Sequence, residues 1–193
     1  YYKILVPEKN SKGKGFRKGY LWVVVGINTR MIYLLYDDGS RSEKVILNEL
    51  GGCKGIIQSD GYSPYRKLES DAYPHITRIP CLQHIKRKFI DCGEDEPDAK
   101  RIVELINTLY QNEHKHKIGV DGWTVEQNLV HRKKYAPDIL GEIKDVLDDI
   151  EERGDLLPKS ELKEAVTYLR NEWNAVVDIF NYGDTYLDNN IVE

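Results

Sequence analysis

The chain has 193 residues, of which 40% are hydrophobic and 31% charged, and its formal net charge is −4 at pH 7. This length suits one domain, or one domain that carries an insertion. No stretch approaches the ~20 apolar residues that a membrane-spanning helix needs, and residues 1–10 lack the layout of a signal peptide. Three cysteines, odd in number and not densely spaced, favour a reduced, cytosolic setting.

Charge is distributed unevenly along the chain. Residues 9–18 hold five basic side chains and no acid, and residues 84–88 hold three more basic side chains, whereas residues 142–155 hold seven acids against two bases. This pattern is expected if one basic face of the protein meets phosphates. Solvated charged surfaces with no partner would give the same pattern, so both interpretations stay open.

Strand-forming residues dominate the first part of the chain. A short turn at 28–30 joins two of the strands, and the lysine- and glycine-rich segment 8–19 predicts a mobile hairpin loop after Pro7. Short connections between successive strands predict an antiparallel meander. Its strands are predicted over residues 1–6, 20–27 and 31–37.

A helix and two further strands follow. Ser42 is a suitable N-cap, and glycine ends the apolar helical pattern, so a helix is predicted over residues 42–52. Strands are predicted over 55–60 and 76–81. This order indicates a mixed α/β fold, in which the strands after the first helix pair in parallel.

The second half of the chain has the apolar spacing of helices and no further strand signal. Apolar residues recur on one helical face within 101–110, 139–150 and 161–180. We therefore expect a core formed by residues 1–83, a helical block over 84–181, and a return to the core over 182–193.

Asp60 ends an apolar run in the stretch "IIQSDGYSPY" at 56–65. Asp-Gly is a strong turn dipeptide, which gives a purely structural interpretation. Alternatively, Asp60 lies at the carboxyl end of a central strand, where open α/β sheets place their sites, and is a metal ligand. Glu193, in the final stretch "YLDNNIVE", allows two interpretations as well. It completes a capping-box spacing with Asn190, or it is a second carboxylate beside Asp60.

The stretch "IPCLQHIKRKF" at 79–89 combines a Cys-x-x-His spacing with three cations. Cys81 and His84 could share a zinc ion, but the two further ligands that a tetrahedral site needs show no matching spacing, so packing of Cys81 and a surface position for His84 are favoured. Lys86, Arg87 and Lys88 are candidates for contact with DNA phosphates. In the basic segment nearer the N-terminus, the corresponding candidates are Lys14, Arg17 and Lys18.

Five stretches resemble, in chain order, the transposases of the bacterial insertion sequence 66 family: "KGYLWVVVG" (18–26), "IIQSDGYSPY", "IPCLQHIKRKF", "LPKSELKEAVTYLRNEW" (157–173) and "YLDNNIVE". The resemblance covers essentially the whole chain. The combination of Asp-Asn-Asn followed by Glu with Cys-x-x-His followed by a basic run is specific, whereas either motif alone is weak.

The resemblance implies a DDE transposase with a ribonuclease-H-like core, that is, a mixed five-stranded sheet with an all-α insertion after the fifth strand. It implies that Asp60 is the second catalytic aspartate and Glu193 the third acid, both ligands of two Mg²⁺ or Mn²⁺ ions. The implied partner is DNA, as transposon ends and as target, in the bacterial cytoplasm and away from membranes. A homodimer is expected in the working complex.

The family's first catalytic aspartate belongs to an Asp-Glu-Thr motif just before the residues that match Tyr1 onward. We therefore expect this chain to be a fragment cut inside the active site and inactive alone. Two other functions stay open: a ribonuclease-H-like module that binds DNA or a partner without catalysis, and a structure-specific nuclease of the same fold.

Overall fold

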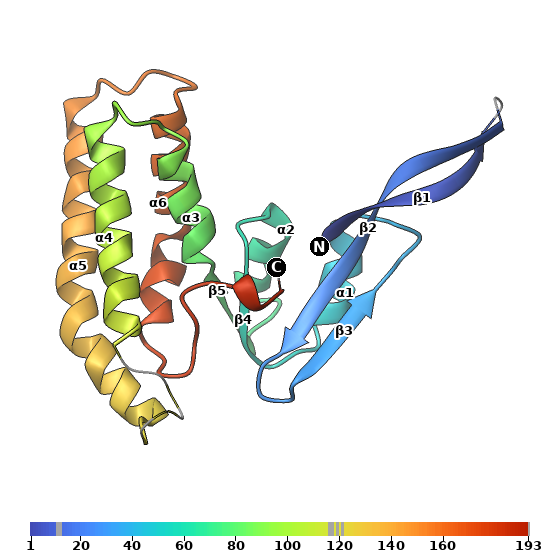
Figure 1. Ribbon diagram of the computed structural model, residues 1–193, viewed down its shortest axis with the longest axis horizontal. Helices are drawn as coiled ribbons and strands as arrows, with labels where there is room; N and C mark the ends of the chain where they lie inside the picture. The colour runs from blue at the N-terminus through green and yellow to red at the C-terminus, as the bar shows by residue number, and fades with distance from the viewer. Residues whose placement is uncertain (11–12, 116–117, 119, 121, 193) are drawn as a thin grey trace. The chain divides into compact units, whose positions relative to one another are not determined.

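The structure is a computed structural model that describes residues 1–10, 13–115, 118, 120 and 122–192, and it divides into two compact units (Figure 1). The first unit comprises residues 1–55, 62–77 and 189–193. The second unit comprises residues 56–61 and 78–188. The first unit contains the antiparallel strands, and the second contains the four long helices.

The antiparallel strands of the first unit are β1 (Tyr2–Asn10), β2 (Gly13–Gly26) and β3 (Met31–Leu35), in the order β1-β2-β3. The predicted meander is therefore confirmed. β1 pairs with β2 from Tyr2 opposite Leu21 onward, whereas β3 pairs with the last part of β2, from Trp22 opposite Leu35. Each half of β2 thus has a strand partner on one side, and its first half forms a two-stranded ribbon with β1.

The predicted loop over residues 8–19 is wrong. β1 continues through Pro7 to Asn10, and β2 begins at Gly13, so most of the segment is paired strand. Pro7 lies opposite Phe16 in a strand that has a partner on one side only, which is where a sheet tolerates proline. The glycines of this segment were read as loop residues, but cross-strand pairing overrides their weak intrinsic preference.

The first unit also contains α1 (Glu43–Leu50), α2 (Ser63–Arg66) and the short 3-10 helices η1 (Lys67–Glu69) and η2 (Asn190–Val192). The predicted cap of α1 is confirmed, because the Ser42 hydroxyl accepts a hydrogen bond from the Lys44 amide, and the helix ends at Gly51. Buried apolar side chains of the unit are Trp22, Ile46, Leu50, Leu68 and Ile76.

Strands β4 (Gly55–Ser59) and β5 (Ile76–Pro80) form a separate pair. The Gly55 amide donates to the His75 carbonyl at 2.8 Å where the strands begin, and the Cys81 amide donates to the Ser59 carbonyl at 3.0 Å where they end. The two strands therefore run in the same direction, as predicted. Within the described residues, hydrogen bonds join the strands into a sheet of three and a sheet of two. The single five-stranded, ribonuclease-H-like sheet stays a prediction.

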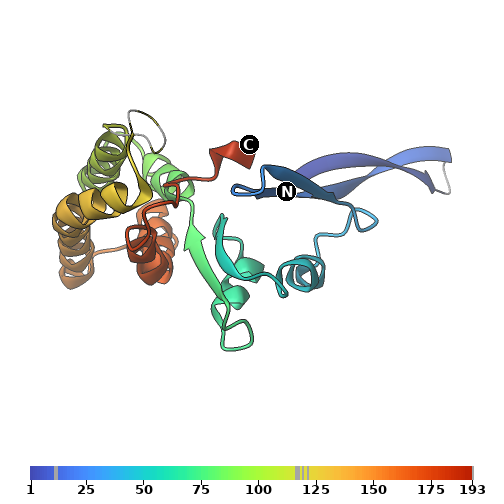
Figure 2. The ribbon, with the colours of Figure 1, turned by 90° about the horizontal axis from the view of Figure 1, so that it is seen from below.

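Four helices build the second unit: α3 (Leu82–Ile90), α4 (Pro97–Glu113), α5 (Val125–Arg153) and α6 (Glu161–Ile179). α3 packs against α4 and α6, and α4 packs against α5, as Figure 2 shows with the helices seen nearly end-on. The predicted helical patterns are confirmed, and their apolar faces meet in one core. None of the helices in the described residues is long and apolar enough to cross a membrane.

Candidate functional site

Asp60 follows the last residue of β4 and is half-buried. The chain bends at Gly61, but this glycine does not have positive φ. A Cβ atom at Gly61 would lie 2.0 Å from the hydroxyl oxygen of Tyr168 on α6, so any larger residue would have to displace the Tyr168 side chain. Gly61, which suggested a turn from the sequence, therefore also has a packing role beside α6.

A buried ion pair fixes the strand end that carries Asp60. Arg78 on β5 pairs with Glu172 on α6, and both side chains are fully buried. The Arg78 guanidinium also lies 3.4 Å from the Ser59 hydroxyl, which in turn donates a hydrogen bond to the Asp60 carbonyl at 3.0 Å. Strand β5, helix α6 and the backbone of Asp60 are thus connected through one polar network.

The segment before the final motif is hydrogen-bonded to the same strand ends. The Gln58 side chain amide donates to the Tyr186 carbonyl at 2.8 Å and to the Pro80 carbonyl at 3.2 Å, and the Leu82 amide donates to the Leu187 carbonyl at 2.8 Å. Residues 128 positions apart in the chain therefore meet beside the carboxyl ends of β4 and β5.

Asp188, the first residue of the final motif, lies near Tyr110 of α4. Burial first, and then the charge of the neighbouring Asp188 carboxylate, raise the pKa of the Tyr110 hydroxyl far above its ordinary value. The hydroxyl therefore stays protonated and remains a donor. Glu193 lies outside the described residues, so its two interpretations, helix cap and metal ligand, stay open.

Arg132 of α5 organises the loop that leads into this segment. Its guanidinium is 1% exposed and forms two hydrogen bonds with the Glu113 carboxylate, at 2.8 and 2.6 Å. It also donates to the Tyr182 carbonyl and to the hydroxyl and carbonyl oxygens of Thr185, each within 2.7 Å. The Tyr135 hydroxyl completes the cluster by donating to Glu113 at 2.5 Å. The end of α4, the middle of α5 and the loop 182–185 are therefore joined at one buried cation.

We expect Arg132→Met to lower the free energy of unfolding by about 3 kcal/mol, because a buried arginine that satisfies several acceptors cannot be removed without leaving them unpaired. Amide hydrogen exchange over residues 182–188 should accelerate by more than it does in the helices. Lys133→Met, the same change at the exposed neighbouring position, is the control and should shift stability by less than about 0.5 kcal/mol. Equal effects of the two variants would contradict the role given to Arg132.

The predicted phosphate contacts on α3 separate into two kinds. Arg87 and Lys88 are exposed, whereas Lys86 is half-buried, with its ammonium 5.8 Å from the centroid of the Tyr110 ring. The helix buries Leu82, Ile85 and Phe89 on its other side. Arg87 and Lys88 are therefore open to a ligand, and the ammonium of Lys86 is beside a ring that can accept a cation–π contact.

The basic residues on the β1–β2 ribbon separate in the same way. Arg17 forms an ion pair with Asp38 at 2.6 Å, whereas Lys18 is exposed. The side chain of Lys14 lies outside the described part of the structure. Among Lys14, Arg17 and Lys18, the described side chain that is open to a ligand is therefore that of Lys18.

Cys81 and His84 lie at the start of α3, with Cys81 buried and His84 half-buried. Among the residues that the structure describes, no group of three or more histidine, cysteine or acidic side chains is placed to hold a metal ion. The burial of Cys81 at the end of β5 agrees with its packing interpretation. The zinc site stays a prediction.

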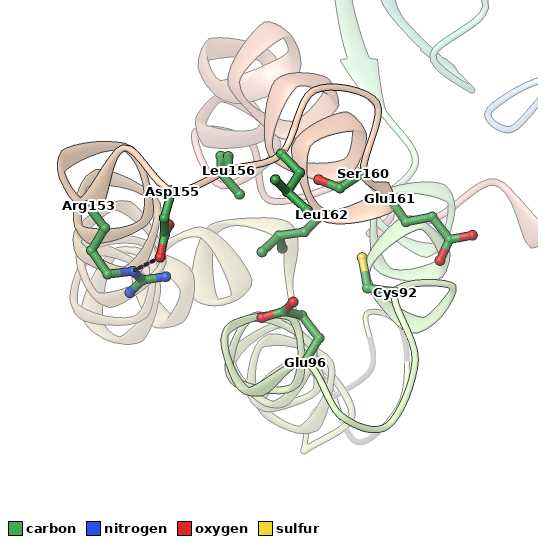
Figure 3. Close-up of a pocket in the computed structure, with 9 residues that line it drawn as sticks. Cys92, Glu96, Arg153, Asp155, Leu156, Ser160, Glu161 and Leu162 are labelled. Carbon is green, nitrogen blue, oxygen red and sulfur yellow. Dashed lines mark ion pairs between the residues drawn. The ribbon is translucent and has the colours of Figure 1, made fainter.

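A pocket of about 320 Å³ lies at the loops between the helices of the second unit, away from the predicted site residues (Figure 3). Cys92 and Glu96 point into it, and Glu161 also lines it. Burial, followed by the nearby carboxylates of Glu161, Glu96 and Asp91, raises the pKa of the Cys92 thiol. The thiol is therefore protonated at neutral pH and is a poor nucleophile.

Four residues of the site were not among those predicted from the sequence: Gln58, Arg78, Arg132 and Glu172. A signal for Arg132 was present, because it falls with Asn128 and Ala136 on the apolar face of α5, at spacings of four residues. A charged residue on a buried face needs a partner, so its position in the pattern indicates a structural role. Glu172 gave the same signal, because it falls with Leu169 and Val176 on the apolar face of α6. No comparable pattern identified its partner Arg78, which lies 94 residues away in the chain.

Comparison with known proteins gives consistent matches. Two uncharacterized proteins of Sinorhizobium fredii are similar to this chain. The protein y4jD is 28% identical over 161 residues, which cover 80% of this chain and 30% of y4jD. The protein y4qI is 25% identical over 191 residues, which cover 91% of this chain and 34% of y4qI. The chain thus spans about a third of the length of these curated relatives.

No solved structure matches the chain. The model of one protein family, described as "Transposase IS66 family", matches residues 3–193. That match includes the strand end at Asp60, the start of α3 and the final motif. The chain therefore belongs to the IS66 family of transposases.

Proposed function

We propose that this chain supplies much of the catalytic core of a DNA transposase, in which Asp60 and Glu193 hold divalent cations over a phosphodiester. One observation supports this most directly. The hydrogen bonds from Gln58 and Leu82 bring the segment before the final motif to the carboxyl ends of β4 and β5, and Gln58 precedes Asp60 by two positions. Three motifs far apart in the sequence thus converge where an α/β sheet places its site.

The donor chemistry of these residues fits Mg²⁺ or Mn²⁺. Asp60 offers a half-buried carboxylate, and hard oxygen ligands suit these ions. When bound, two such ions activate the attacking oxygen and stabilise the leaving oxygen. We propose that the remaining acid comes from the family's Asp-Glu-Thr motif ahead of Tyr1, and that the five strands form one ribonuclease-H-like sheet.

The chain's other residues hold and orient the site in this proposal. Glu172, Arg78 and Ser59 fix the backbone of Asp60, while Arg132 fixes the loop that leads to the final motif. Arg87 and Lys88 are exposed on α3, which begins directly after β5, and we assign them to phosphate contacts. A homodimer that pairs two DNA ends is part of the proposal.

An assay with an extended protein, carrying this chain behind the family's Asp-Glu-Thr motif, tests the proposal. The protein is incubated with Mg²⁺ and DNA that bears the element's ends together with a target plasmid. We expect cleavage at the ends and joining to the target. Cleavage without joining would assign a nuclease instead, and DNA binding without cleavage would assign a non-catalytic module. Either result would reject the proposed function.

A further inference from the structure

The β1–β2 ribbon has two faces of different composition. In an antiparallel pair, residues that lie opposite each other point to the same face, and successive residues alternate between faces. The pairing register therefore shows on which of the two faces each described side chain of the ribbon lies. One face, named the lysine face below, carries the described side chains of Lys3, Leu5, Pro7, Phe16, Lys18 and Tyr20. The register continues with Lys9 opposite Lys14, whose side chains lie outside the described part.

The opposite face of the ribbon is partly covered by the protein itself. Arg17 pairs there with Asp38, and a Cβ atom at Gly19 would lie 2.5 Å from the Val6 side chain and 3.3 Å from the Gly39 backbone. The Tyr20 amide also donates to the Gly39 carbonyl at 3.1 Å. The connection after β3 therefore covers this face at Arg17 and Gly19, and it neutralises Arg17.

The lysine face is exposed and carries no acid among its described positions. Leu5 and Phe16 are each 70% exposed, and Lys3 and Lys18 are exposed beside them. Glu8, the only acid in the sequence of the ribbon, lies on the opposite face, because it is an odd number of residues from Lys3, Leu5 and Pro7 along β1. An exposed leucine and phenylalanine set among lysines are poorly suited to water alone, but they suit a partner that is both polyanionic and partly apolar.

We propose that the lysine face binds duplex DNA, a proposal that rests on the transposase function above and adds the surface that holds the substrate. The major groove of DNA admits a two-stranded ribbon. Lys3 and Lys18 contact phosphates, while Leu5 and Phe16 contact sugars and base edges inside the groove. Arg17 is excluded from the contact by its ion pair with Asp38.

Within the first unit, the lysine face continues into a cluster of aromatic rings. Tyr20 makes an edge contact with Tyr1, and the Arg41 guanidinium lies 4.6 Å from the centroid of the Tyr1 ring and 4.3 Å from that of Tyr62. Tyr62 follows Asp60 by two residues. The cluster therefore links the proposed DNA surface to the segment that leaves the candidate catalytic strand.

Fluorescence anisotropy with a labelled duplex, in EDTA so that no cleavage occurs, tests the proposal on the full chain. Lys3→Ala with Lys18→Ala should weaken binding at least about tenfold and reduce the slope of log affinity against log salt by about 2, since each lost phosphate contact removes about 0.9. Phe16→Ala should weaken binding but leave the salt slope unchanged, because it removes no charge.

The matched control is Lys44→Ala with Lys54→Ala, which removes two exposed lysines from the same unit but not from the ribbon. The control variant should bind DNA as the parent chain does. Equal losses in the two double variants, or no loss in the ribbon variant, would overturn the proposal. Loss of self-association in size-exclusion chromatography, with DNA binding intact, would assign the lysine face to a second copy of the chain instead.

The two proposals fail separately. The binding assay contains no metal ion and needs no catalysis, so an inactive protein that still loses affinity on Lys3→Ala with Lys18→Ala would sustain the DNA surface and reject the catalytic role. A protein that cleaves DNA normally with the ribbon variant would reject the surface alone. Unchanged thermal melting of each variant, expected for exposed positions, shows that the loss is not one of folding.

Discussion

Asp60→Asn is expected to abolish DNA strand cleavage by the extended protein, with a fall of at least about a hundredfold in rate. Loss of a residue that merely supports a metal ligand costs ten- to a hundredfold, so loss of a ligand's own charge should cost more. Asparagine keeps the size of the side chain and one oxygen, but it removes the negative charge that a hard divalent cation needs. The effect should therefore fall on chemistry and spare the fold.

Cleavage of labelled DNA ends in Mg²⁺ measures this effect. The thermal melting temperature of Asp60→Asn should match that of the parent protein, which would show that the variant is folded. Asp71→Asn is the matched control, since Asp71 is exposed and lies outside every motif of the site. Duplex binding in EDTA should persist in both variants. Normal cleavage by Asp60→Asn would remove Asp60 from the catalytic set and leave it a structural residue at the bend after β4.

Breaking the Arg78–Glu172 pair should have the largest effect on stability. Either Arg78→Met or Glu172→Leu alone is expected to lower the free energy of unfolding by about 3–5 kcal/mol, because each leaves its former partner as a charge in a site with no exposure to water. A typical domain has only ~5–15 kcal/mol in total. Far-UV circular dichroism during urea unfolding measures the loss, since helices α3–α6 dominate that signal.

The double variant, Arg78→Met with Glu172→Leu, should recover most of the stability, because a buried ion pair replaced by apolar side chains of similar size is often neutral. Glu142→Gln, which breaks the exposed Arg101–Glu142 pair, is the control and should change stability by less than about 1 kcal/mol. Additive losses in the double variant would show that the two side chains do not act as a pair. Recovery of stability without recovery of DNA cleavage would indicate that the pair also positions Asp60 through Ser59.

The bounds of helices α1 and α6 and of strands β3, β4 and β5 were predicted within two residues, whereas the ribbon of β1 and β2 was missed. The hydrogen bonds of a helix join residues four apart, so its start, end and buried face are set by nearby residues. Ser42 and Gly51 bounded α1 as predicted, and the apolar spacing located the buried faces of α4, α5 and α6. The lysine- and glycine-rich segment 8–19 gave no such local signal, and its pairing across β1 and β2 depends on residues that meet only in the fold.

By itself, the sequence determined the family, the helical second half, and the candidate residues at the strand end and in the final motif. Only the tertiary structure decided which of these candidates are accessible and what holds them. It paired Arg17 with Asp38, buried Arg78 against Glu172 and Arg132 against Glu113, and placed Tyr168 over Gly61. The physical reason is that burial and charge pairing are properties of residues distant in the chain. A side chain's own identity shows that it needs a partner, whereas the packing of other elements determines which partner it finds.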